Sequence, residues 1–185
     1  GLGRVALMSE NTEGAESWFQ RAEEWDPGQG HLEFGQGLLA RARGENDEAR
    51  SQFQYAFRRN RSYADAMIEI SHIQNDGLVE RFAMKRTLRR AVEADPSHPS
   101  AHMELGKTLE NQNDMDGAIE SYENQIRINP ESGEALMRLG FVLLERERYW
   151  HARQRLYQAI QITSGNELEL SLAIAATYLG DRQFV

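Results

Sequence analysis

The sequence lacks cysteine and has no long apolar run. Without cysteine, disulfides and thiol chemistry are excluded. No stretch approaches the roughly 18 consecutive apolar residues that a membrane-spanning helix needs, and no charged-then-apolar leader is visible. These absences predict a soluble segment with no direct membrane insertion, and they leave the cytoplasm and the periplasm equally open.

Positive charge is also scarce, since the chain has a formal net charge of −8 and a pI near 5.2. This balance argues against a nucleic-acid backbone as main ligand, because such binding relies on neutralising phosphates with Lys and Arg. One basic cluster stands out, and we interpret it as a solvated outer face of a helix: Arg81, Lys85, Arg86, Arg89 and Arg90. Nearly all cations are arginine, which favours a bacterial source with a GC-rich genome.

The stretch Pro99–Glu131 predicts two helices joined by a tight turn. Leu105, Gly106 and Leu109 fall on one face of a helix with 3.6 residues per turn. After a polar break, a second series ends where Pro130 removes a backbone donor and disfavours helix at the preceding residue. Pro99 is expected in the first turn of the first helix, where its missing N–H has no partner anyway.

The same pattern recurs about every 34 residues along the chain. With Pro99 as position 1, position 8 holds a small residue, position 20 an alanine and position 24 a large one in three of the units. These positions are occupied by Gly37, Ala49 and Phe53, by Gly106, Ala118 and Tyr122, and by Gly140, Ala152 and Leu156. Small residues let two helices approach to about 8–10 Å, and the large residue fills the remaining space.

A 34-residue period with these positions resembles the tetratricopeptide repeat family. The resemblance implies an all-α, right-handed α-solenoid of helix-turn-helix repeats, with about 11 helices and truncated at both ends. It spans residues 1–185 as a single array, with units 1–29 (partial), 30–64, 65–98, 99–132, 133–166 and 167–185 (partial). The third unit departs from the pattern, because Ser71-His72 replaces the usual Leu-Gly.

The last stretch, Glu167–Leu179, allows two interpretations. Its alternating leucines could form a strand, but the repeat register favours a sixth first helix. Such a helix is apolar on more than one face, which makes a poor solvent cap for a solenoid. We therefore expect that further repeats follow in a longer protein or that this end packs on another chain, including a second copy.

The resemblance also implies a concave groove lined by the first helices of successive units. The positions that face this groove are mostly apolar, which favours an extended or helical segment of a partner protein with apolar anchors. An alternative is that the apolar ones simply pack against neighbouring first helices. The predicted peptide-binding residues are Phe34, Leu38, Glu69, Ile73, Met103, Lys107, Met137, Arg138, Phe141 and Leu144.

No pattern predicts catalysis, a cofactor or a metal. His98 and His102 are four residues apart, but no acidic third ligand accompanies them. No glycine-rich loop has the spacing that binds phosphate. We therefore predict a non-catalytic scaffold that binds a protein or peptide within a larger assembly. The alternative is the recognition or assembly arm of a longer multidomain enzyme.

Overall fold

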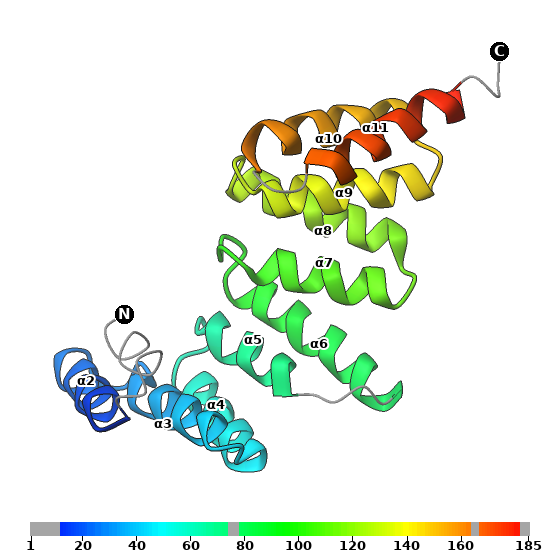
Figure 1. The fold of residues 1–185 in the computed structure, drawn as a ribbon. Coiled ribbons are helices and arrows are strands. Elements are labelled where there is room, and N and C mark those ends of the chain that lie inside the picture. Colours follow the sequence, from blue (N-terminus) through cyan, green and yellow to red (C-terminus); the bar gives the residue numbers. More distant parts are fainter. Residues whose placement is uncertain (1–11, 74–77, 164–166, 182–185) are drawn as a thin grey trace. The chain divides into compact units, whose positions relative to one another are not determined.

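A computed structural model describes residues 12–73, 78–163 and 167–181, and these residues form ten α-helices and no strand (Figure 1). The helices are α2 (Thr12–Trp25), α3 (His31–Ala42), α4 (Asn46–Arg59), α5 (Ala64–Ile73), α6 (Leu78–Ala94), α7 (Ala101–Asn111), α8 (Met115–Ile128), α9 (Gly133–Glu145), α10 (Tyr149–Ile162) and α11 (Glu167–Asp181). The all-α fold is therefore confirmed. The eleventh helix expected before α2 lies outside the described residues.

The chain forms two compact units, Gly1–Pro96 and Ser97–Val185. In the first, each helix from α2 to α6 packs on the next one along the chain. In the second, the same holds from α7 to α11, and α9 also contacts α11. Packing between sequence neighbours is the arrangement that stacked helix pairs require, because each pair buries its faces only against the adjacent pair.

Glycine at position 8 sets the distance between paired helices. A Cβ placed on Gly106 would lie 2.5 Å from the Tyr122 ring. A Cβ placed on Gly37 would lie 2.6 Å from the Phe53 ring, and one placed on Gly140 would lie 2.6 Å from the Leu156 side chain. Real Cβ atoms do not approach neighbours this closely, so glycine allows these helix pairs to dock at the observed distance, and the predicted role of positions 8 and 24 is confirmed.

The turns inside three repeats share one backbone geometry. Gly44, Asn113 and Glu147 each have positive φ, of 78°, 61° and 57°. The next residue in each case donates its N–H back to a carbonyl five residues earlier, as in Glu45 to Ala40. This is the Schellman ending of a helix, in which a left-handed residue closes the last turn.

Of two predictions about helix ends, one is confirmed and one is wrong. The last stretch is helical, as the register predicted, over Glu167–Asp181. The placement of Pro99 in a first helical turn was wrong, because α7 begins at Ala101 with Ser100 as its cap residue. The Ser100 N–H bonds the His98 ring nitrogen at 3.3 Å instead, which holds Pro99 outside the helix. Within the described residues, no helix is long and apolar enough to cross a membrane.

Candidate functional site

The structure divides the ten predicted groove residues into two groups by exposure. Five are buried, with exposed fractions of 4–8%: Phe34, Leu38, Glu69, Ile73 and Met103. The other five are partly exposed: Lys107, Met137, Arg138, Phe141 and Leu144. All of the second group lie on α7 and α9. Surface that a partner can reach among these residues is therefore concentrated in the second unit.

In the first unit, the predicted residues pack against the chain itself. The Phe34 ring lies 5.4 Å from the Phe53 ring and 4.9 Å from the Tyr63 ring, between centroids. The buried Glu69 carboxylate forms an ion pair with Arg41. Their binding role stays a prediction, but in this chain these side chains present little free surface.

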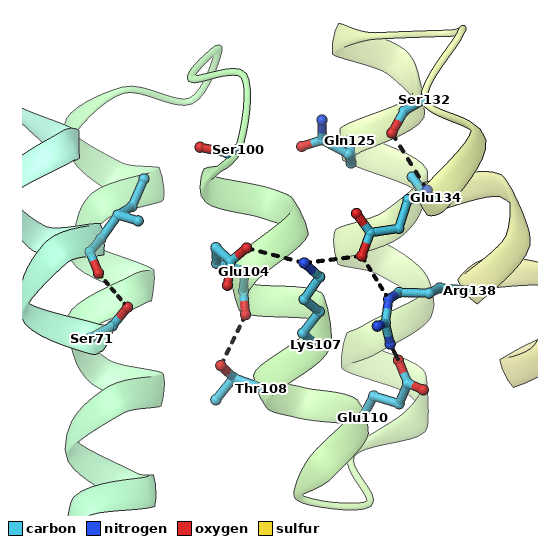
Figure 2. A network of polar contacts seen from close by, with 12 residues as sticks. Ser71, Ser100, Glu104, Lys107, Thr108, Glu110, Gln125, Ser132, Glu134 and Arg138 are labelled. Atoms are coloured by element: carbon cyan, nitrogen blue, oxygen red, sulfur yellow. Dashed lines mark hydrogen bonds and ion pairs between the residues drawn. The ribbon is translucent and has the colours of Figure 1, made fainter. Parts of the chain in front are cut away.

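In the second unit, a series of ion pairs joins α7 to α9. Figure 2 shows these side chains on their helices. Lys107 Nζ lies 3.2 Å from a Glu104 oxygen and 3.0 Å from a Glu134 oxygen. The same Glu134 oxygen lies 3.2 Å from Arg138 Nε, and Arg138 Nη1 lies 3.3 Å from Glu110. We call Glu104, Lys107, Glu110, Glu134 and Arg138 the α7–α9 strip.

Helical spacing explains why these side chains meet. Glu104 and Lys107 are three residues apart on α7, and Glu134 and Arg138 are four apart on α9, so each pair shares one helical face. Glu110 comes from the last turn of α7 and also accepts a hydrogen bond from the Tyr122 hydroxyl of α8. The strip is thus held by three successive helices.

The charges of the strip stabilise one another. Partial burial opposes the charge of Lys107, but the hydrogen bonds and charges of Glu134 and Glu104 outweigh it and raise the pKa of Lys107. Partial burial likewise disfavours ionised Glu134, yet Lys107 and Arg138 outweigh it and lower the pKa of Glu134. Burial, followed by the bond to Glu110, raises the pKa of the Tyr122 hydroxyl. The shifts in pKa thus favour the charged forms of Lys107 and Glu134 and the neutral form of Tyr122, which acts as a hydrogen-bond donor.

Because its side chains are partly exposed, the strip can exchange an internal ion pair for an ion pair with a ligand. The exposed fractions of the side chains are 28% for Lys107, 34% for Arg138 and 48% for Glu134. Exposed ion pairs contribute only about 0–1 kcal/mol each, because water competes for both charges. A ligand carboxylate can replace Glu134 on the two cations at little cost to the fold.

Apolar side chains flank the strip on α9. Met137, Phe141 and Leu144 are partly buried and pack against a cluster that includes Leu170 and Ile174 of α11. Their exposed edges adjoin the charges of α9, so α9 presents both polar and apolar groups. The two histidines considered as metal ligands are buried, and in the described part of the chain no three His, Cys, Asp or Glu side chains gather as a metal site would require.

Comparison with known proteins accounts for this architecture. Residues 34–71 and 85–128 match the sequence profile of the tetratricopeptide repeat. Both stretches are tetratricopeptide repeats. Such repeats generally act as protein-interaction scaffolds, and the matched stretches include the helix pairs α3–α4 and α7–α8 in large part.

Several characterised proteins resemble the chain. The type IV pilus assembly protein PilF of Pseudomonas aeruginosa is 34% identical over 79 residues, which cover 43% of this chain and 31% of that protein, so the match spans about a third of it. A structure of Pseudomonas aeruginosa PilF has a TM-score of 0.72 at 18% identity and covers 99% of this chain and 88% of that one.

Two further structures share the fold. MamA has a TM-score of 0.66 at 20% identity, with 87% of this chain and 94% of that one covered. YrrB, described as a tetratricopeptide repeat protein with an unusual peptide-binding site, has a TM-score of 0.64 at 21% identity, with 92% and 87% covered. At these identities the likeness shows the fold alone.

Sequence reasoning missed part of the strip. Three of its members, Glu104, Glu110 and Glu134, are absent from the ten predicted residues, although opposite charges three and four apart on α7 and α9 were a signal. Tyr122, which bonds the strip from α8, is absent as well. The link between Glu110 and Arg138 joins residues 28 apart and had no local signal. The surface consequently carries more charge than the sequence predicted.

Proposed function

We propose that this chain is a non-catalytic scaffold that binds a peptide or helix of a partner protein along α7 and α9, as part of a larger assembly. The observation that carries the proposal is the α7–α9 strip, whose charges are partly exposed and are bordered by the exposed edges of Met137, Phe141 and Leu144. Apolar anchors supply affinity, and the charges orient the ligand.

The similar proteins support both parts of the proposal. YrrB is described as having a peptide-binding site, and PilF is named for pilus assembly. We carry over the general roles only, namely peptide binding and participation in an assembly. The ligand that fits the strip here is an amphipathic segment with at least one carboxylate for Lys107 and Arg138 and apolar side chains for α9.

Selection from a random peptide library tests this proposal with defined ligands. Peptides that bind the full chain are synthesised, and their affinities are measured by calorimetry for the chain and for a Lys107→Gln/Arg138→Gln variant. Hydrogen bonds to charged groups are worth about 1.5–3 kcal/mol each. Allowing for exposure, we expect the double substitution to weaken binding about tenfold or more.

The matched control is Arg127→Gln/Arg155→Gln, which makes the same charge change on α8 and α10. Arg127 is exposed, and Arg155 bonds only the adjacent turn through Gln158. We expect the control to bind selected peptides within about twofold of the parent chain. Equal affinities for all three proteins, or a selection without enriched peptides, would refute binding at the strip.

We extend the proposal to self-association through the end formed by α11. Leu172 and Leu179 are 64% and 67% exposed, and they are seven residues apart, on one side of the helix. Tyr178 is 46% exposed beside them. Large apolar side chains gathered on one helix face favour burial against another apolar surface, and a second copy of this chain supplies such a surface.

A further inference from the structure

A second charged surface lies in the first unit, on different helices from the strip. It is a pocket of about 380 Å³ between α4, the segment after it, α5 and α6. Five arginines contribute to its lining, together with Phe57, Met67 and Ile70 as its apolar part: Arg50, Arg58, Arg61, Arg86 and Arg90. Figure 1 locates these helices in the first unit.

The arginines of this pocket are not neutralised. In the described ranges, no carboxylate forms an ion pair with any of the five, although the chain as a whole has a net charge of −8. A smaller hollow that shares Phe57, Arg61 and Arg90 includes Glu93 as its one carboxylate. Five like charges that form no ion pair with a described carboxylate repel one another, so an anion that enters the pocket relieves this repulsion.

Two observations indicate that the pocket is ordered for a ligand. The guanidinium carbons of Arg61 and Arg90 lie 5.4 and 5.0 Å from the centre of the buried Phe57 ring. Such stacking fixes the guanidinium planes and leaves their N–H donors free to bind in the plane. In addition, Arg50 Nε is buried and has no acceptor among the described residues. Buried donors are normally hydrogen-bonded, so a ligand oxygen would satisfy this N–H group.

We propose that this pocket binds an acidic segment of a partner protein, with a carboxylate side chain held between the arginines. Arginine presents a planar fork that matches a carboxylate bidentately. A short acidic segment suits the chain better than a nucleic acid, because a long polyanion that extends beyond the pocket meets a predominantly negative molecule. The pocket is formed by other helices than the α7–α9 strip, and the proposal does not depend on the function proposed for the strip.

The basic cluster noted in the sequence contributes two of the five arginines of this pocket. Arg86 and Arg90 are exposed, as a solvated outer face requires. They nevertheless converge with Arg50 and Arg58 of α4 and with Arg61 on one pocket. The arginines come together only because α4 and α6 belong to one packed unit, so the spacing of residues within α6 does not predict the pocket.

Fluorescence anisotropy with a labelled, end-capped hexaglutamate peptide tests the site. We expect binding by the full chain, weakening of at least about tenfold in an Arg61→Gln/Arg90→Gln variant, and strong weakening with rising salt. The control is Arg21→Gln/Arg43→Gln, which removes two exposed charges from the same unit at α2 and at the end of α3. The control should bind within about twofold of the parent chain.

Circular dichroism checks that both variants stay folded, as expected because Arg61 and Arg90 are exposed. Three results would overturn the proposal: no hexaglutamate binding by the parent chain, equal weakening in the pocket variant and the control, or tighter binding of an oligothymidylate of the same charge. The last result would assign the pocket to nucleic acid.

Discussion

Substitution of Gly106 by alanine probes the contact between α7 and α8 with a single methyl group. The new Cβ would lie 2.5 Å from Cε1 and 2.7 Å from Cδ1 of Tyr122. Tyr122 has no exposed surface, and its hydroxyl donates to Glu110. The ring is therefore held by packing on all sides and by a hydrogen bond at its end, so the helices must separate to admit the methyl group.

Two opposing effects set the size of the change. Overpacking a well-packed core costs about 1–3 kcal/mol. Alanine in place of glycine inside a helix returns about 0.5–1 kcal/mol, because it restricts the unfolded chain. Since Tyr122 cannot turn aside, we expect Gly106→Ala to lower the free energy of unfolding by roughly 1–2 kcal/mol. For a chain of this length, that corresponds to a fall in Tm of roughly 2–8 °C.

A double-mutant cycle followed by circular dichroism separates the packing term from helix propensity. Tyr122→Val removes the ring atoms that the Gly106 methyl would meet, and in that background Gly106→Ala should become neutral or stabilising. We expect a coupling free energy of about 1 kcal/mol or more between the two positions. An equal cost in both backgrounds, or a higher Tm for Gly106→Ala alone, would refute the account of close docking.

Two further outcomes follow from the turns and from α11. Glu147 has a φ of 57°, which costs a side chain about 1–2 kcal/mol, while the freer unfolded chain of a glycine costs about 0.5–1 kcal/mol. Glu147→Gly should therefore gain about 0.5–1 kcal/mol and raise the Tm by roughly 1–4 °C, whereas Arg148→Gly, at a φ of −82°, should lower it. Self-association through α11 predicts a concentration-dependent mass in light scattering that a Leu172→Glu/Leu179→Glu variant abolishes, and a parent chain that is monomeric up to about 100 μM would contradict it.

The helix pairs were predictable because a few residues at fixed positions determine how they pack. A glycine, an alanine and a large side chain recur at fixed positions, and each has one geometric task in the docked pair. Each of the three sets falls on one observed helix pair, α3–α4, α7–α8 or α9–α10. The start of α7 was not predictable in this way, because the bond from Ser100 to His98 is a local contact that no apolar period encodes.

The candidate site was less predictable because exposure depends on neighbouring repeats. Phe34 and Met137 occupy equivalent groove positions in the sequence pattern, yet Phe34 is 4% exposed and Met137 is partly exposed. The difference arises from Phe53 and Tyr63, whose rings pack on Phe34. A position in a repeat pattern indicates which way a side chain points, but neighbours decide whether it remains available.

One long-range contact recurs with its charges reversed, and this reversal bears on specificity. In the first unit, Arg41 of α3 pairs with Glu69 of α5, and in the second, Glu110 of α7 pairs with Arg138 of α9. Both pairs span 28 residues and join the first helices of successive repeats. Because α3 carries the cation in one unit and α7 the anion in the other, the two pairs have opposite orders of charge. A peptide bound along α7 and α9, as proposed, would therefore not meet the same order of charge along α3 and α5, although the helices are built on the same repeat.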